Sequence, residues 1–226
     1  MIEIAKEVFA AAGLRLPPFA FWTADDWSAK GPETEEIRRA MLGWDVTDFG
    51  LGNFAEYGRV LFTLRNGYRK DGVLTKNYAE KFILDPPNQK PPLHFHRSKM
   101  EDIVNRGGAG NIQVRLYAST PEGQCSKADF TVQIDGITRT VPAGTLVRLE
   151  PGQSICLPPY LIHQFWGEEG TGTQVGQTRY AVSGEVSSVC DDWNDNCFLE
   201  PVERFCRIEE DAPRRHYLCN EYPVVK

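Results

Sequence analysis

From Gly58 onward, short segments of strand-forming residues alternate with glycine, proline, asparagine and aspartate, and this pattern restricts the possible folds strongly. Short strands separated by frequent turn residues are typical of antiparallel sandwiches and barrels. Asp135-Gly136 is the residue pair that a two-residue hairpin turn prefers. The pattern predicts strands at Val60–Leu64, Asn77–Leu84, Leu93–His96, Ile112–Ala118, Phe130–Ile134, Ile137–Val141, Leu146–Leu149, Ser154–Leu157, Leu161–Trp166, Gln177–Val189 and His216–Tyr222. The sequence therefore predicts a mainly β fold.

The N-terminal part of the chain has a helical pattern instead. Apolar residues recur with helical spacing over Ile4–Ala12, and Thr23–Asp26 has the form of a helix capping box. Pro32 suits the first position of a further helix, which we expect to end before Gly43. Residues 1–43 are therefore predicted to form helices that pack on the β structure.

Size and composition are those of an ordinary globular protein, with 226 residues, 41% hydrophobic and 25% charged. We expect a single domain over residues 1–226, in which residues 44–226 form a β-barrel that includes C-terminal strands. A formal net charge of −6 and the lack of a lysine or arginine cluster argue against nucleic-acid binding. No apolar run has the length of a membrane span.

Two further features favour a cytoplasmic protein. Charged residues interrupt the apolar N-terminus, so we expect no signal peptide. The six cysteines are scattered without a C-x2-C pair, which is the pattern of reduced thiols rather than of a disulfide framework.

The segment LHFHRSKME contains the most informative residues of the chain. His94 and His96 are two residues apart, and in a strand such residues point to the same face. Glu101 follows after a short turn, and His163 lies in a distant strand-like segment. Three imidazoles and one carboxylate suit a divalent transition metal. An isolated His-x-His pair can also be two ordinary surface or core histidines, but three of the chain's four histidines fall in this group.

At these residues the sequence resembles the cupin family. The two motifs here read His94-x-His96-x4-Glu101-x6-Gly108 and Gly152-QSICL-Pro158-Pro159-Tyr160-x2-His163. The chain departs from the usual motif, without losing a ligand, at Asn88, Tyr160 and Gly167. The resemblance implies a cupin-type jelly-roll β-barrel with N-terminal helices, in which His94, His96, Glu101 and His163 bind one metal.

Two charged residues in predicted strands are candidates for proton transfer. A metal that holds two neighbouring sugar oxygens would acidify a hydrogen on carbon, and moving that proton requires a positioned base. Glu185 in SGEVSSV could be that base and Lys81 in YAEKFIL a cation beside it. By pattern alone, solvent exposure is the more common outcome for both residues, and Asp191–Asn196 could be an ordinary acidic turn.

Longer blocks of sequence resemble the D-lyxose isomerase family. The blocks are LGWDVTDFG with Asn53-Phe54, LFTLRNG, YAEK, HFH to Glu101 followed by DIVNRGG, SICLPP, GEVSSV followed by an Asp/Asn run, and LCNEY. They extend from about Leu42 to Tyr222. The resemblance implies a cytoplasmic, manganese-dependent homodimer that interconverts D-lyxose and D-xylulose and often D-mannose and D-fructose, with Co²⁺, Zn²⁺ or Fe²⁺ as other possible metals.

The resemblance also assigns expected roles to individual residues. It makes metal ligands of His94, His96, Glu101 and His163. It makes Lys81 a pocket residue that stabilises negative charge, Glu185 the base, and Asp195 a pocket residue that assists ring opening or hydroxyl proton exchange. Other members have histidine within the acidic run, where this chain has Asn194 and Cys197.

The expected reaction is aldose–ketose isomerisation through a cis-enediol, with a hydride shift as the alternative chemistry. Two other classes of function remain open at this stage. One is an iron-dependent cupin dioxygenase, which would have the same ligands, and the other is a sugar-binding cupin without catalysis.

Overall fold

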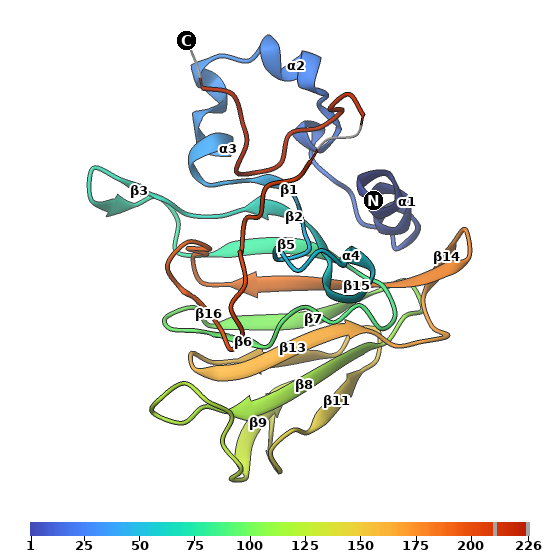
Figure 1. Ribbon diagram of the computed structural model, residues 1–226, viewed down its shortest axis with the longest axis vertical. Helices are drawn as coiled ribbons and strands as arrows, with labels where there is room; N and C mark the ends of the chain where they lie inside the picture. Colours follow the sequence, from blue (N-terminus) through green and yellow to red (C-terminus); the bar gives the residue numbers. More distant parts are fainter. Residues whose placement is uncertain (210–211, 225–226) are drawn as a thin grey trace.

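The computed structural model describes residues 1–209 and 212–224. Two antiparallel β-sheets face each other, with the helices and the C-terminal segment gathered beyond one side of the larger sheet (Figure 1). The larger sheet has the order β1 (Gly43–Thr47), β2 (Arg59–Arg65), β5 (Ala79–Asp85), β15 (Thr178–Ser187), β7 (Glu101–Gly107), β12 (Ser154–Leu157), β9 (Phe130–Ile134) and β10 (Ile137–Val141), with β14 (Thr173–Val175) paired to β15. The smaller sheet has the order β11 (Leu146–Leu149), β8 (Ile112–Ala118), β13 (Leu161–Gly167), β6 (His94–His96) and β16 (Asn196–Phe198). A short hairpin, β3 (Arg69–Lys70) and β4 (Val73–Leu74), projects from the larger sheet.

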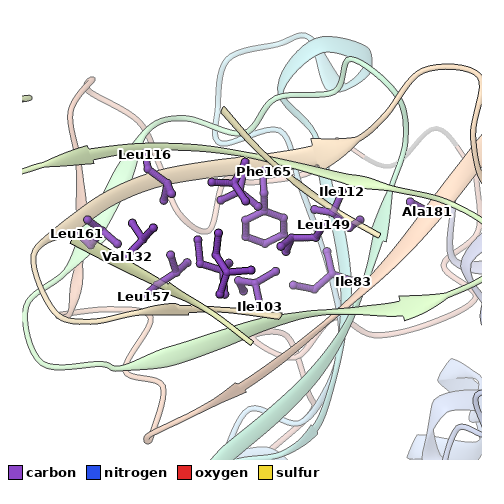
Figure 2. Packing of buried hydrophobic residues seen from close by; sticks show 14 of the residues in the cluster. Ile83, Ile103, Ile112, Leu116, Val132, Leu149, Leu157, Leu161, Phe165 and Ala181 are labelled. Atoms are coloured by element: carbon purple, nitrogen blue, oxygen red, sulfur yellow. The ribbon is translucent and has the colours of Figure 1, made fainter. Parts of the chain in front are cut away.

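The main hydrophobic core lies between the two sheets (Figure 2). Ile83, Ile103 and Leu157 of the larger sheet cluster there with Leu116 and Phe165 of the smaller sheet. Successive strand residues point to opposite faces, so the apolar alternation of the sequence becomes one buried face on each sheet. Complete burial of each such side chain contributes about 1.5–3 kcal/mol. Ile83 and Phe165 also line the cavity of the candidate active site.

The helical segment covers the outer face of the larger sheet. It contains α1 (Ile2–Ala11), a 3₁₀ turn at Pro18–Phe21, α2 (Ala24–Ser28), a 3₁₀ turn at Pro32–Thr34 and α3 (Glu35–Arg39), and α4 (Phe54–Tyr57) follows β1. In α1, Ala5, Val8 and Phe9 are buried against the sheet. The ring of Phe9 lies 6.2 Å from that of Trp44 and 5.9 Å from that of Phe82, measured between centroids. None of the described helices is long and apolar enough to cross a membrane.

Most predictions of local structure are confirmed. The mainly β fold is present, and several strands have the predicted bounds, among them β8 to β12. Asp135 and Gly136 have φ of 51° and 77°, as the predicted hairpin turn requires. Thr23 and Asp26 form the capping box, each accepting a hydrogen bond from the backbone of the other. The sheets do not close into a single hydrogen-bonded ring within the described residues, so the barrel is open.

The prediction of a strand at His216–Tyr222 is wrong, and with it the expectation of C-terminal strands at this position. This segment is irregular and is fixed at separate points rather than by a ladder of backbone bonds. The amide of Cys219 donates to the carbonyl of Trp44 (2.7 Å), and the hydroxyl of Tyr222 donates to the carbonyl of Leu42 (2.6 Å). The alternating pattern in this segment therefore reflects packing on the N-terminal region rather than pairing in a sheet.

Of the strands in the described residues, six were not predicted from the sequence pattern: β1, β3, β4, β7, β14 and β16. In β7 the buried positions include Glu101 and Asn105, so the usual apolar alternation is absent. Asn105 is satisfied internally, since its side-chain amide donates to the carbonyls of Gly110 (2.8 Å) and Leu149 (2.9 Å). A buried polar residue with such partners is stable in a strand although its sequence pattern does not predict one.

Candidate active site

Neighbouring strands of the smaller sheet bring three histidines together. The strand β6, which carries His94 and His96, lies between β13 and β16, and His163 is directly opposite His94 in the β13–β6 register. The ring centroids of His94 and His163 are 4.4 Å apart, and those of His94 and His96 are 5.2 Å apart. One ring nitrogen from each of the three lies within 4.8 Å of the others. The local two-residue spacing and the pairing of β6 with β13 together produce this group.

The turn before β13 fixes the second histidine segment against the first. Tyr160, at the position where cupins usually have glycine, has φ of 65°. This left-handed conformation costs about 1–2 kcal/mol for a residue with a Cβ atom, which explains the usual glycine. The amide of Tyr160 donates to the carbonyl of His96 (2.8 Å) and so links the two motifs directly.

The hydrogen bonds of the imidazoles determine which ring nitrogen faces the cluster. Nδ1 of His94 lies 3.0 Å from the carbonyl of Pro92, and Nδ1 of His163 lies 2.9 Å from that of Leu161. A carbonyl can only accept, so each Nδ1 carries the proton and each Nε2 presents a lone pair. Nε2 of His163 is buried and makes no hydrogen bond within the described residues. Burial and the other imidazoles hold the pKa of His94 well below its usual range, so this ring is neutral.

Glu101 lies beside the imidazoles at the start of β7 and is almost completely buried. Its Oε1 atom is 3.0 Å from Nε2 of His163 and 3.3 Å from Nε2 of His96. Burial alone would raise the pKa of Glu101, but Lys99 and His96 outweigh burial and hold it well below its usual range. Three imidazoles and an ionised carboxylate therefore converge, and the three histidines could hold a divalent metal.

Glu185 and Lys81 face the same cavity from the larger sheet. They are directly opposite each other in the β15–β5 register, and Nζ of Lys81 is 3.3 Å from Oε1 of Glu185. Both side chains are buried, with 4% and 7% of their surfaces exposed, so the possibility of solvated strand residues is wrong. The short distance and the shared face follow from cross-strand pairing, which the sequence pattern could not reveal.

A second lysine, Lys99, connects the base candidate to the imidazole cluster. Its Nζ atom lies 2.6 Å from Oε2 of Glu101 and 3.0 Å from Oε1 of Glu185. Burial alone would raise the pKa of Glu185, but Lys81 and Lys99 lower it below its ordinary value, so the carboxylate is ionised. The hydroxyl of Ser187 (2.9 Å) and the thiol of Cys190 (3.2 Å) also donate to Oε1 of Glu185. Oε2 accepts no hydrogen bond within the described residues, which leaves it available to a ligand.

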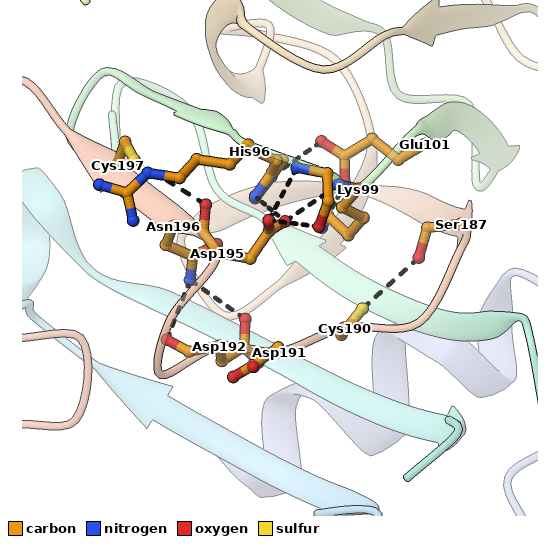
Figure 3. Close-up of polar contacts among 12 residues, drawn as sticks. His96, Lys99, Glu101, Ser187, Cys190, Asp191, Asp192, Asp195, Asn196 and Cys197 are labelled. Carbon is orange, nitrogen blue, oxygen red and sulfur yellow. Dashed lines mark hydrogen bonds and ion pairs between the residues drawn. The ribbon is translucent and has the colours of Figure 1, made fainter. Parts of the chain in front are cut away.

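Asp195 occupies a different position from the one expected. It does not line the cavity, and its oxygens accept hydrogen bonds from the amide (2.8 Å) and hydroxyl (2.6 Å) of Ser98 and from the amide of Lys99 (3.1 Å). Figure 3 shows Asp195 beside His96, Lys99 and Glu101. Asp195 therefore fixes the turn that carries Lys99, and the acid of the same run that does line the cavity is Asp192.

Several cavity residues were missed in the sequence. Lys99 lies within the quoted segment HFHRSKME, where its position between two predicted ligands was the available indication. Arg59 and Arg204 also line the cavity, and no motif marks either of them. Arg59 forms a buried ion pair with Asp85 (2.6 Å), so one polar wall of the cavity is fixed by the framework of the larger sheet.

Comparisons with known sequences agree on one family. A family model described as D-lyxose isomerase matches residues 1–222. The chain is 46% identical over 218 residues to the D-lyxose/D-mannose isomerase of Escherichia coli O157:H7, covering 96% of this chain and 92% of that protein. It is 44% identical over 223 residues to the D-lyxose/D-mannose isomerase of Serratia proteamaculans, covering 98% and 94%.

Solved structures similar to this chain include an L-ribose isomerase from Cellulomonas parahominis. That structure has a TM-score of 0.55 and 17% identity and covers 89% of this chain and 90% of the other. The L-ribose isomerase of Geodermatophilus obscurus has a TM-score of 0.55 and 15% identity, with 89% and 90% covered. At this identity the similarity concerns the fold, which is cupin-like.

Proposed function

This chain belongs to the D-lyxose isomerase family, and we propose that it is a metal-dependent aldose–ketose isomerase that interconverts D-lyxose and D-xylulose, and also D-mannose and D-fructose. One observation carries the proposal beyond the family. A buried carboxylate with a free oxygen, Glu185, faces the same cavity as a group of three imidazoles and Glu101. This combination suits reversible proton transfer next to a carbonyl, because a bound ion would polarise the carbonyl and the carboxylate would move the proton.

The metal would be held by His94, His96, His163 and Glu101. The unpartnered Nε2 of His163 and the ionised Glu101 fit such an ion. Nε2 has no hydrogen-bond partner within the described residues, and the carboxylate adds a negative charge to the ligand set. When bound, the ion would polarise the substrate carbonyl and acidify the hydrogen on the neighbouring carbon. We propose Mn²⁺ on the family resemblance, although Co²⁺, Zn²⁺ or Fe²⁺ also suit nitrogen and oxygen ligands.

Glu185 would act as the base through its free Oε2 atom. In this proposal it removes the proton from C2 of the open-chain aldose and returns it to C1 of the cis-enediol. Lys81 and Lys99 are fixed beside it and would stabilise negative charge that develops on the substrate oxygens. Because both oxygens of Asp195 are engaged with the turn at Ser98 and Lys99, we assign Asp195 a positioning role instead of ring opening.

The test of this function is a colorimetric ketose assay on protein stripped with EDTA. D-lyxose and D-mannose are supplied as substrates, and Mn²⁺, Co²⁺ or Zn²⁺ is added back in separate reactions. We expect ketose to form only after a metal is restored. Equal ketose formation by the stripped protein, with its metal content measured as negligible, would contradict metal dependence.

Solvent deuterium distinguishes the enediol route from a hydride shift. A proton held on Glu185 can exchange with solvent, so turnover in D₂O should place deuterium at C1 of the product ketose. Complete absence of label after a single turnover would favour a hydride shift, in which the hydrogen never leaves the substrate.

The other two classes of function leave observed features without a role. Neither a sugar-binding cupin nor an iron-dependent dioxygenase requires an ionised Glu185 between two buried lysines. Oxygen consumption by the iron-loaded protein would test the dioxygenase.

We further propose a homodimer in the cytoplasm. The family resemblance suggests both properties, and the six free cysteines support a reducing compartment. Gel filtration with light scattering would test the dimer.

A further inference from the structure

Arg204 has a buried nitrogen whose role the proposed reaction does not explain. Its Nη2 atom donates to Oδ2 of Asp45 (2.6 Å) and lies 3.3 Å from Oδ2 of Asp192. Its Nη1 atom is buried and has no hydrogen-bond partner within the described residues. Buried guanidinium nitrogens are normally paired, since an unpaired polar group in the interior is costly. A ligand that supplies an acceptor to Nη1 would remove this cost.

The position of Arg204 indicates which part of a ligand it would meet. Arg204, Asp192, Asn196 and Phe198 line both the inner cavity and an outer hollow of about 370 Å³. Arg204 therefore lies between the inner cavity and this outer hollow. A molecule that extends outward from the imidazole cluster would reach it.

A series of polar contacts leads from the proposed base to this position. Nζ of Lys81 is 3.3 Å from Glu185 and 4.0 Å from Oδ2 of Asp192, which in turn lies 3.3 Å from Nη2 of Arg204. Asp192 and Arg204 are thus connected to Glu185 through Lys81. The pair offers one acceptor and one free donor side by side, which matches two neighbouring hydroxyl groups.

We infer that Asp192 and Arg204 form the recognition site for the hydroxyl groups at the end of the sugar remote from C1 and C2. This inference rests on the proposed isomerase function. Asp192 accepts a hydrogen bond from one hydroxyl of the C3–C5 part of the chain, and Nη1 of Arg204 donates to the oxygen of its neighbour. Asp45, which is almost fully buried, holds the guanidinium in place before the sugar binds.

The first experiment uses the unmodified protein loaded with Mn²⁺. The value of kcat/KM is measured for D-lyxose and for its 3-deoxy, 4-deoxy and 5-deoxy analogues. Loss of a hydrogen bond to a charged group should lower kcat/KM by about 10- to 100-fold for at least one analogue. Analogues that all react as well as D-lyxose would overturn the inference.

The second experiment combines these sugars with the substitution Arg204→Lys. Lysine keeps a cation beside Asp45 and Asp192 but lacks the second nitrogen, so the fold should survive while the free donor is lost. We expect Arg204→Lys to lower kcat/KM for D-lyxose by about 10- to 100-fold relative to the parent protein. In this variant, kcat/KM for the deoxy analogue that reacts poorly with the parent protein should lie within about 3-fold of kcat/KM for D-lyxose. Arg148→Lys, at an exposed arginine paired with Glu150 and Glu168, is the matched control.

Non-additivity separates recognition from a purely structural role. If Arg204→Lys only distorted the site, removing the sugar hydroxyl and substituting Arg204 would lower kcat/KM independently. The fold-loss for both changes together would then be the product of the two single fold-losses. That result would overturn the inference. Metal content and melting temperature of the variant should match those of the parent protein.

Failure of the isomerase function is distinguishable from failure of this site. If no aldose is converted to ketose, calorimetric binding of D-arabinitol, the polyol obtained by reducing D-lyxose, decides the inference. Binding that weakens at least about 10-fold in Arg204→Lys supports the site. No binding to the parent protein, or equal binding to both proteins, overturns it.

Discussion

The substitution Glu185→Gln tests the central feature of the site, an ionised carboxylate between two lysines. Glutamine has the same shape, so its amide oxygen can replace Oε1 as acceptor for Ser187 and Cys190. Its NH₂ group would then occupy the place of Oε2, which accepts no hydrogen bond in the described residues. The change therefore removes the base and one negative charge with little alteration of geometry.

We expect kcat to fall by about 10²- to 10⁴-fold, the usual contribution of a positioned general base. Stability should fall much less. Both lysines keep another carboxylate, since Lys99 is 2.6 Å from Glu101 and Lys81 is 4.0 Å from Asp192. The loss in unfolding free energy should therefore stay below the roughly 3–5 kcal/mol of a buried ion left without a partner.

The measurements are initial ketose formation from D-lyxose, denaturant unfolding, and metal content of both proteins. Exchange of the C2 hydrogen of D-lyxose with D₂O should decline in parallel with kcat. A variant that binds metal normally and retains kcat within about 3-fold of the parent would refute the assignment of Glu185 as the base.

Three further predictions concern other parts of the molecule. His163→Gln should lower the metal affinity by more than the roughly 10- to 100-fold typical of substitutions at residues that hydrogen-bond to a ligand. Metal titration in competition with a chelator measures this affinity, and an unchanged affinity would contradict His163 as a ligand. Gly136→Ala should lower the free energy of unfolding by about 1–2 kcal/mol in denaturant unfolding, because a φ of 77° strains a residue that has a Cβ atom. An added Cβ would meet nothing within 4 Å, so backbone strain is the whole expected effect, and no loss would contradict the turn geometry. Burial and Glu185 raise the pKa of Cys190 to about 11, so iodoacetamide at neutral pH should leave this thiol unmodified in peptide mapping, whereas rapid labelling would contradict its burial.

The candidate metal ligands could be predicted from sequence for a physical reason. His94 and His96 are on one strand, where the two-residue period sets the direction of both side chains. Their proximity to His163 required only that β6 and β13 belong to one sheet, which the motif resemblance supplied. The strands from β8 to β12 were equally predictable, because their alternation and the Asp135-Gly136 turn are local properties.

The rest of the site depends on contacts between distant residues. The sequence pattern left Glu185 and Lys81 as either inward or exposed. The pairing of β15 with β5 places the two residues opposite each other, and the packing of this sheet puts both on the cavity side. Lys99 is directed inward by a turn that Asp195 holds from almost a hundred positions away.

Local alternation of apolar and polar residues indicates most of the longer strands and which way two histidines on one strand point, because the two-residue period of a strand is a local property. The direction of a side chain in a loop depends instead on the elements packed around it. For this reason only the tertiary structure decides that Asp192 rather than Asp195 lines the cavity, that Arg204 joins it, and that His216–Tyr222 crosses the N-terminal region without forming a strand.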